Sequence, residues 1–123
     1  MIYLDNAAST PVHEKVIEEM LPYFKEQYGN PSSIHRHGRL ANTAIQNSRK
    51  RIASLINANG NEVLITSGGT ESNNTAIYGI ASQNKGKHII TSAIEHDAIL
   101  EPCKRLEKEG CRIRFSQLIN MVL

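Results

Sequence analysis

The sequence has few cysteines and no long hydrophobic run, and these absences exclude several classes of protein. Its two cysteines, Cys103 and Cys111, stand eight positions apart, which fits neither a zinc-ligand spacing nor a disulfide framework. No stretch approaches the roughly 18 apolar residues of a membrane-spanning helix. The N-terminus lacks the basic and apolar regions of a signal peptide. We therefore expect a reduced, cytoplasmic protein without a metal site or membrane association.

The chain also lacks an excess of charge of one sign. Its 123 residues include 14 basic and 12 acidic side chains, which is too balanced to indicate a nucleic-acid partner. The short basic cluster at 49–51 falls in a helix-like stretch, and we interpret it as a solvated helix face. The hydrophobic fraction of 40% argues against disorder, and the length predicts one ordinary domain.

Hydrophobic spacing and turn residues predict an α/β fold. We expect helices over about 12–24, 38–57, 70–82 and 98–109. Short apolar runs predict strands at 62–66, 88–92 and 111–115. This order gives a parallel-sheet βαβαβ core preceded by two helices, with right-handed crossovers and both sheet faces covered.

The first helix has two further expected features. Thr10 should cap it, with Pro11 at its first helical position. Pro22 falls inside it, where a proline kinks or splits a helix. Its apolar stripe is expected to face the core and to carry no chemistry; the stripe consists of Val12, Val16, Ile17, Met20, Leu21 and Phe24.

The strongest chemical signal joins the first predicted strand to the third helix, in the segment 66–74 (TSGGTESNN). Gly68 and Gly69 allow positive φ and close approach of a ligand to the backbone. The helix N-terminus that follows offers unpaired N–H groups, and Thr70 adds a hydroxyl, so we predict a phosphate site. A plain turn capped by Thr70 is the alternative. The segment matches neither the P-loop nor the dinucleotide-binding fingerprint.

A second signal, Glu95-His96-Asp97, follows the second predicted strand. Ligands of open α/β sheets sit beyond the carboxyl ends of the strands, where this tripeptide and the glycine segment both fall. His96 could stack on a cofactor ring, bind a metal or move protons, and a cap or surface role is the alternative. For His35 and His37 we expect a structural or exposed role.

Four segments together resemble a known family. They are 3–11 (YLDNAASTP), 29–35 (GNPSSIH), 66–74 and 91–96 (TSAIEH). In this order they are similar to the NifS/IscS-type cysteine desulfurases of the class-V aminotransferase family, over residues 2 to about 115. The resemblance implies the N-terminal part of the large domain of the type I pyridoxal 5′-phosphate (PLP)-dependent transferase fold. It also implies sulfur transfer from L-cysteine to an acceptor or iron–sulfur scaffold protein, with L-alanine as product, and a homodimer in the full-length form.

The resemblance assigns roles residue by residue. Gly69 and Thr70 are expected to hold the PLP phosphate, and His96 to stack on the pyridine ring as a catalytic residue that assists proton transfer. The segment 6–8 is expected near the substrate entrance. The Schiff-base lysine, the aspartate on the pyridine nitrogen and the nucleophilic cysteine of the family belong to later segments, and neither Cys103 nor Cys111 matches them.

By the same resemblance the chain divides into an arm at 1–11, a partial PLP-binding large domain at 12–115 and a tail at 116–123 unlike the family. We interpret the tail as the result of a frameshift near Phe115, in the gene or in the reading of its sequence. The 123-residue chain alone is expected to be inactive and marginally stable, with uncovered strand edges and helix faces. Alternatives are a non-catalytic truncated product, a selenocysteine lyase-like enzyme, or a complete small phosphate- or nucleotide-binding domain.

Overall fold

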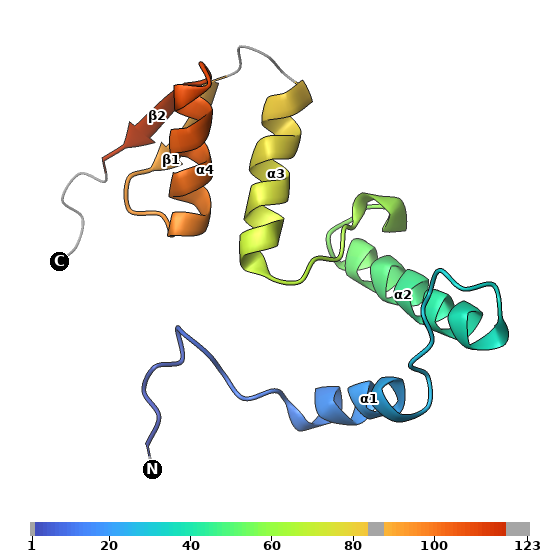
Figure 1. Ribbon diagram of the computed structural model, residues 1–123. Coiled ribbons are helices and arrows are strands. Elements are labelled where there is room, and N and C mark those ends of the chain that lie inside the picture. The colour runs from blue at the N-terminus through green and yellow to red at the C-terminus, as the bar shows by residue number, and fades with distance from the viewer. Residues whose placement is uncertain (1, 84–87, 118–123) are drawn as a thin grey trace. The chain divides into compact units, whose positions relative to one another are not determined.

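The computed structural model describes residues 2–83 and 88–117, and the chain divides into two compact units (Figure 1). The first unit is Met1–Leu64 and the second is Ile65–Leu123. The two units are described separately below. The expected tail boundary at 116 stays a prediction, because residues 118–123 lie outside the described residues.

The first unit contains helices α1 (Glu14–Lys25) and α2 (Arg36–Leu55) and the short 3-10 helix η1 (Gly60–Glu62). The predicted start of α1 is wrong, since His13 is the N-cap in place of Thr10. The His13 imidazole nitrogen Nδ1 accepts a hydrogen bond from the backbone N–H of Lys15 at 3.3 Å, so one of the free N–H groups of the first turn gains a partner. Of the kink or split expected at Pro22, the split does not occur, because α1 continues through Pro22 as one helix.

The apolar stripe of α1 is not buried, contrary to the sequence-based expectation. No residue of α1 is buried, and the exposed fraction is 48% for Val16 and 71% for Phe24. A helical stripe gains free energy only where another element removes it from water. The expectation of uncovered helix faces is therefore confirmed at α1.

The loop that leads into α2 is held by close backbone packing. A Cβ atom at Gly38 would lie 2.2 Å from the carbonyl oxygen of Ser33, so this turn requires glycine. His35 caps α2 through Nδ1, which accepts from the N–H of Gly38 at 3.2 Å. The His37 ring stacks on Tyr28 with 6.3 Å between the ring centres. Both histidines thus have the structural roles expected of them.

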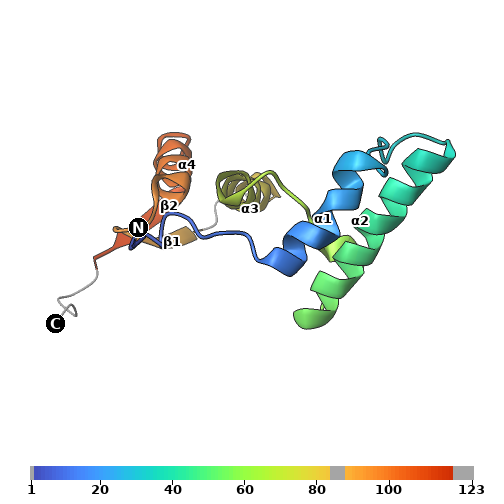
Figure 2. The ribbon, with the colours of Figure 1, turned by 90° about the horizontal axis from the view of Figure 1, so that it is seen from below.

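The second unit contains α3 (Gly69–Gln83), β1 (His88–Ser92), α4 (Asp97–Lys108) and β2 (Arg112–Ser116). The two strands pair in parallel, with Ile89 opposite Ile113 and Thr91 opposite Phe115. Helix α4 makes the crossover between the strands, and α3 packs beside α4, as Figure 2 also shows. The predicted α/β class with parallel strands is confirmed.

The strand expected at 62–66 is wrong within the described residues. Glu62 ends η1, and residues 63–66 pair with no other segment there. Val63 itself has extended backbone angles, with φ −98° and ψ 117°. A strand exists through hydrogen bonds to a neighbouring strand, and β1 and β2 bond only to each other in the described ranges. Val63 is therefore extended, but the segment is not part of a sheet in the described residues.

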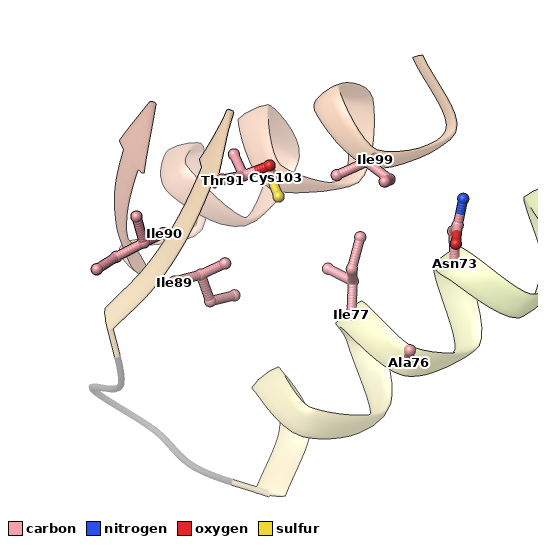
Figure 3. Close-up of a pocket in the computed structure, with 8 residues that line it drawn as sticks. All are labelled: Asn73, Ala76, Ile77, Ile89, Ile90, Thr91, Ile99 and Cys103. Atoms are coloured by element: carbon pink, nitrogen blue, oxygen red, sulfur yellow. The ribbon is translucent and has the colours of Figure 1, made fainter. Parts of the chain in front are cut away.

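The core of the second unit lies between α4 and one face of the sheet. Ala98, Cys103 and Leu106 of α4 are buried. An apolar hollow of about 200 Å³ lies between these elements. Ile77 of α3, Ile89 of β1 and Ile99 of α4 are among the residues that line it (Figure 3). Ile90, the next residue of β1, is 62% exposed, so the expectation that both sheet faces are covered is wrong at this position. No helix in the described ranges has the length and apolar character needed to cross a membrane.

Candidate functional site

A hydrogen-bond network fixes the turn that precedes α3. The backbone N–H and the hydroxyl of Ser67 both donate to Oε2 of Glu71, each at 2.6 Å. The hydroxyls of Thr66 and Ser72 lie 2.6 Å apart and form a second link across the turn. The Ser67 hydroxyl, and after it the Ser67 N–H, lowers the pKa of Glu71 from its ordinary value of 4.5. Glu71 is therefore a carboxylate at neutral pH and stabilises the start of the helix.

The first turn of α3 has the geometry of an anion site. The first bond of the helix joins the N–H of Ser72 to the carbonyl oxygen of Gly68 at 3.1 Å. The preceding N–H groups, including those of Gly69 and Thr70, have no acceptor within the helix and carry its partial positive charge. Neither glycine has a positive φ, contrary to the sequence-based expectation. A Cβ atom built on Gly69 would meet nothing within 4 Å, so space is open at this position.

His96 follows β1 and begins α4. It is the N-cap residue of α4, with extended backbone angles of φ −63° and ψ 148°. Its Nδ1 accepts a hydrogen bond from the N–H of Ala98 at 3.0 Å. The capping role considered from the sequence is therefore present, and His96 as a residue is exposed.

A hollow of about 280 Å³ lies between the starts of α3 and α4. It is lined by Gly69, Thr70, Asn73, His96 and Ala98. The fold thus brings together the three residues predicted to bind the cofactor, although their roles stay predictions. The segment 6–8, expected at the substrate entrance, belongs to the first unit, so its role also stays a prediction.

Sequence reasoning missed two residues that line this hollow, Asn73 and Ala98. Helical spacing contains a signal for the first, because Asn73 is four residues after Gly69 and hence on the same helix face. Ala98 is two residues after His96 and adds a small apolar surface. The sequence gives no comparable signal for Ala98. Its place beside His96 depends on α4 starting at Asp97, one residue before the predicted start.

The two cysteines lie outside this hollow. Cys103 is buried under α3 and β1, and burial raises the pKa of its thiol. A thiol reacts as its thiolate, so this environment makes Cys103 a poor nucleophile. Cys111 is half-buried just before β2. Within the described residues, no three His, Cys, Asp or Glu side chains gather in a metal-binding arrangement.

Comparison with known proteins gives consistent family matches. The aminotransferase class-V family model matches residues 2–121. A relative described as cysteine desulfurase IscS, from Dictyoglomus turgidum, is 55% identical over 116 residues, which are 93% of this chain. The chain spans only 29% of that relative's length.

Solved structures agree in fold. A NifS-like protein superposes with a TM-score of 0.85 at 36% identity, covering 93% of this chain and 32% of the other. A structure described as SspA in complex with cysteine gives a TM-score of 0.83 at 40% identity, covering 92% of this chain and 33% of the other. On the family match over residues 2–121, the chain belongs to the class-V aminotransferase family.

Proposed function

We propose that this chain is the phosphate-holding part of a PLP-dependent cysteine desulfurase. The observation that carries the proposal is the meeting of Gly69, Thr70 and His96 around one hollow at two helix starts. The whole protein would take sulfur from L-cysteine and leave L-alanine. Relatives named cysteine desulfurase support this activity.

The residues present fit the cofactor's phosphate. The free N–H groups at the start of α3 and the hydroxyl of Thr70 are donors suited to a phosphate dianion. Position 69 has no side chain, and nothing lies within 4 Å of where a Cβ would be, so phosphate oxygens can approach the backbone. Glu71, the carboxylate of this turn, is bonded to Ser67 and does not line the hollow. Its charge is therefore held away from the phosphate.

The ring of the cofactor would lie against His96. An imidazole offers a flat face for stacking, and the bond from Ala98 to Nδ1 restrains the orientation of this ring. When bound, PLP supplies an electron sink for carbanion chemistry. The described residues would orient it: the start of α3 would hold the phosphate, and the cap of α4 positions the imidazole.

We extend the proposal to the substrate and the partners. L-Cysteine as substrate is supported by the names of the relatives and by the cysteine in the SspA structure. A sulfur acceptor or iron–sulfur scaffold protein, a homodimer and a cytoplasmic location follow the same family resemblance.

A ligand comparison tests the phosphate site. In a ¹⁵N-resolved titration of the 123-residue chain, PLP should shift the amide signals of Gly69 and Thr70, whereas pyridoxal, which lacks the phosphate, should leave them in place. Thr70→Val, which removes the hydroxyl at nearly constant volume, should weaken PLP binding about fivefold, the value of one hydrogen bond. Equal binding of PLP and pyridoxal would overturn the assignment of the phosphate site.

A further inference from the structure

Asn74 connects the two helix starts that form the hollow. Its side-chain amide nitrogen donates to the carbonyl oxygen of Thr70 at 2.8 Å, in the first turn of α3. The same nitrogen lies 3.5 Å from the carbonyl oxygen of Ala98 in α4, a long hydrogen bond. Ala98 in turn donates its N–H to His96. One amide group therefore links Thr70 to the residue that holds the His96 ring.

The carbonyl of Ala98 needs a donor because of a proline four residues later. In an α-helix this carbonyl would accept from the N–H of residue 102, but that residue is Pro102, which has none. Ala98 and Pro102 are both buried, so little water reaches this point of α4. A buried carbonyl without a partner destabilises the fold. Asn74 supplies the missing donor from the neighbouring helix.

We propose that Asn74 is a positioning residue that, with Pro102, sets the distance between the phosphate side and the ring side of the cofactor site. This inference rests on the proposed function. The pairing makes the contact between α3 and α4 specific: the proline leaves the carbonyl free, and the asparagine binds it. A ligand that bridges both helix starts depends on this distance, while a ligand held by α3 alone does not.

A comparison of PLP with inorganic phosphate tests the positioning role of Asn74. PLP would contact both α3 and His96, whereas inorganic phosphate would need only the start of α3. In the 123-residue chain, Asn74→Ala should weaken PLP binding about fivefold, the effect of one lost hydrogen bond. The same variant should change inorganic phosphate binding by less than about twofold. Thr75→Ala, at an exposed position on the same helix, should change neither affinity and serves as the matched control.

A double-mutant cycle gives a readout that requires no cofactor. Pro102→Ala restores an N–H for the Ala98 carbonyl, so Asn74→Ala should cause a smaller fold-change in the unfolding equilibrium on that background than on the wild type. Strictly additive effects would overturn the pairing of Asn74 with Pro102. If Asn74→Ala alone fails to fold, the double variant should still fold, because the N–H that Pro102→Ala introduces then bonds the Ala98 carbonyl in place of Asn74.

Failure of this inference differs from failure of the proposed function. If the wild-type chain prefers PLP to pyridoxal but Asn74→Ala binds PLP equally well, the positioning role is wrong and the phosphate site stands. A parallel loss of PLP and phosphate affinity in Asn74→Ala would also overturn it, because general destabilisation affects both. If the wild type binds PLP no better than pyridoxal, the proposed function fails. The double-mutant cycle then still tests the pairing of Asn74 with Pro102, because it needs no cofactor.

Discussion

Ser67 and Glu71 are joined by two hydrogen bonds that end on a single carboxylate oxygen, Oε2 of Glu71. Both bonds favour the ionised form of Glu71 and so lower its pKa. The stability that ionised Glu71 contributes is fully present above its ordinary pKa of 4.5. It is lost as the pH falls through the lowered pKa that Glu71 has in the folded protein. The start of α3, and with it the proposed phosphate site, should therefore loosen in acid.

We predict that the carboxyl carbon of Glu71, followed by NMR during an acid titration, changes at a pH below 4.5. Ser67→Ala removes the hydroxyl, the larger of the two causes, and should move that midpoint upward. Glu101 of α4, whose pKa is lowered by its bond to Lys104, should keep the same midpoint in both proteins and serves as the internal control. An unchanged Glu71 midpoint in Ser67→Ala would contradict the network described for this turn.

Replacement of Gly38 by alanine should unfold or strongly loosen the first unit. The new methyl group would lie 2.2 Å from a backbone oxygen, and such overpacking costs about 1–3 kcal/mol. Gly79→Ala is the contrasting change, since the added Cβ meets nothing within 4 Å and should stabilise α3 by up to ~1 kcal/mol. Urea unfolding followed by circular dichroism measures both. A Gly38→Ala protein as stable as the wild type would contradict the packing of this loop.

The cysteines should differ in their reactivity toward alkylating reagents. Cys103 is 1% exposed and has a raised thiol pKa, whereas Cys111 is half-buried. Iodoacetamide labelling followed by peptide mass spectrometry should modify Cys111 first, and Cys103 only after urea is added. Early modification of Cys103 would show that α4 does not pack as described.

The 123-residue chain should release no sulfide from L-cysteine in the presence of PLP. Sulfur abstraction needs a thiolate nucleophile, and Cys103 is buried away from the hollow lined by His96. A methylene-blue sulfide assay measures this, with a complete cysteine desulfurase as positive control. Turnover by the chain alone would contradict both the expected role of later segments and the inert character assigned to Cys103.

The sequence was most informative where local chemistry decides the structure. The strand at 88–92 was predicted at its observed bounds, and Gly110, at φ 94°, follows α4 as a helix-ending glycine does. The start of α1 was missed because Thr10-Pro11 is a good helix start in isolation, and His13 provides a competing cap three residues later. Local patterns do not rank two such caps.

The missed features depend on contacts between distant segments. Residues 62–66 have the composition of a strand, but pairing needs a neighbour that composition does not reveal. Gly69, Thr70 and His96, which line one hollow, were selected by motif, since a helix start and a cap are local structures; their roles stay predictions. The contact between Asn74 and Ala98 was not, because it depends on how α3 packs against α4 and on a proline 28 residues after the asparagine.

The cap on α4 restricts the chemistry open to His96. Because Nδ1 accepts the Ala98 N–H, the proton of the neutral imidazole resides on Nε2, and the ring offers its surroundings a donor. A second proton would have to enter at Nδ1, the atom already engaged, and would break the cap. A proton on Nδ1 and the cap bond from the Ala98 N–H thus exclude one another. The neutral imidazole can donate a hydrogen bond from Nε2 while the cap bond is kept, but Nδ1 can accept a proton only if that bond is given up.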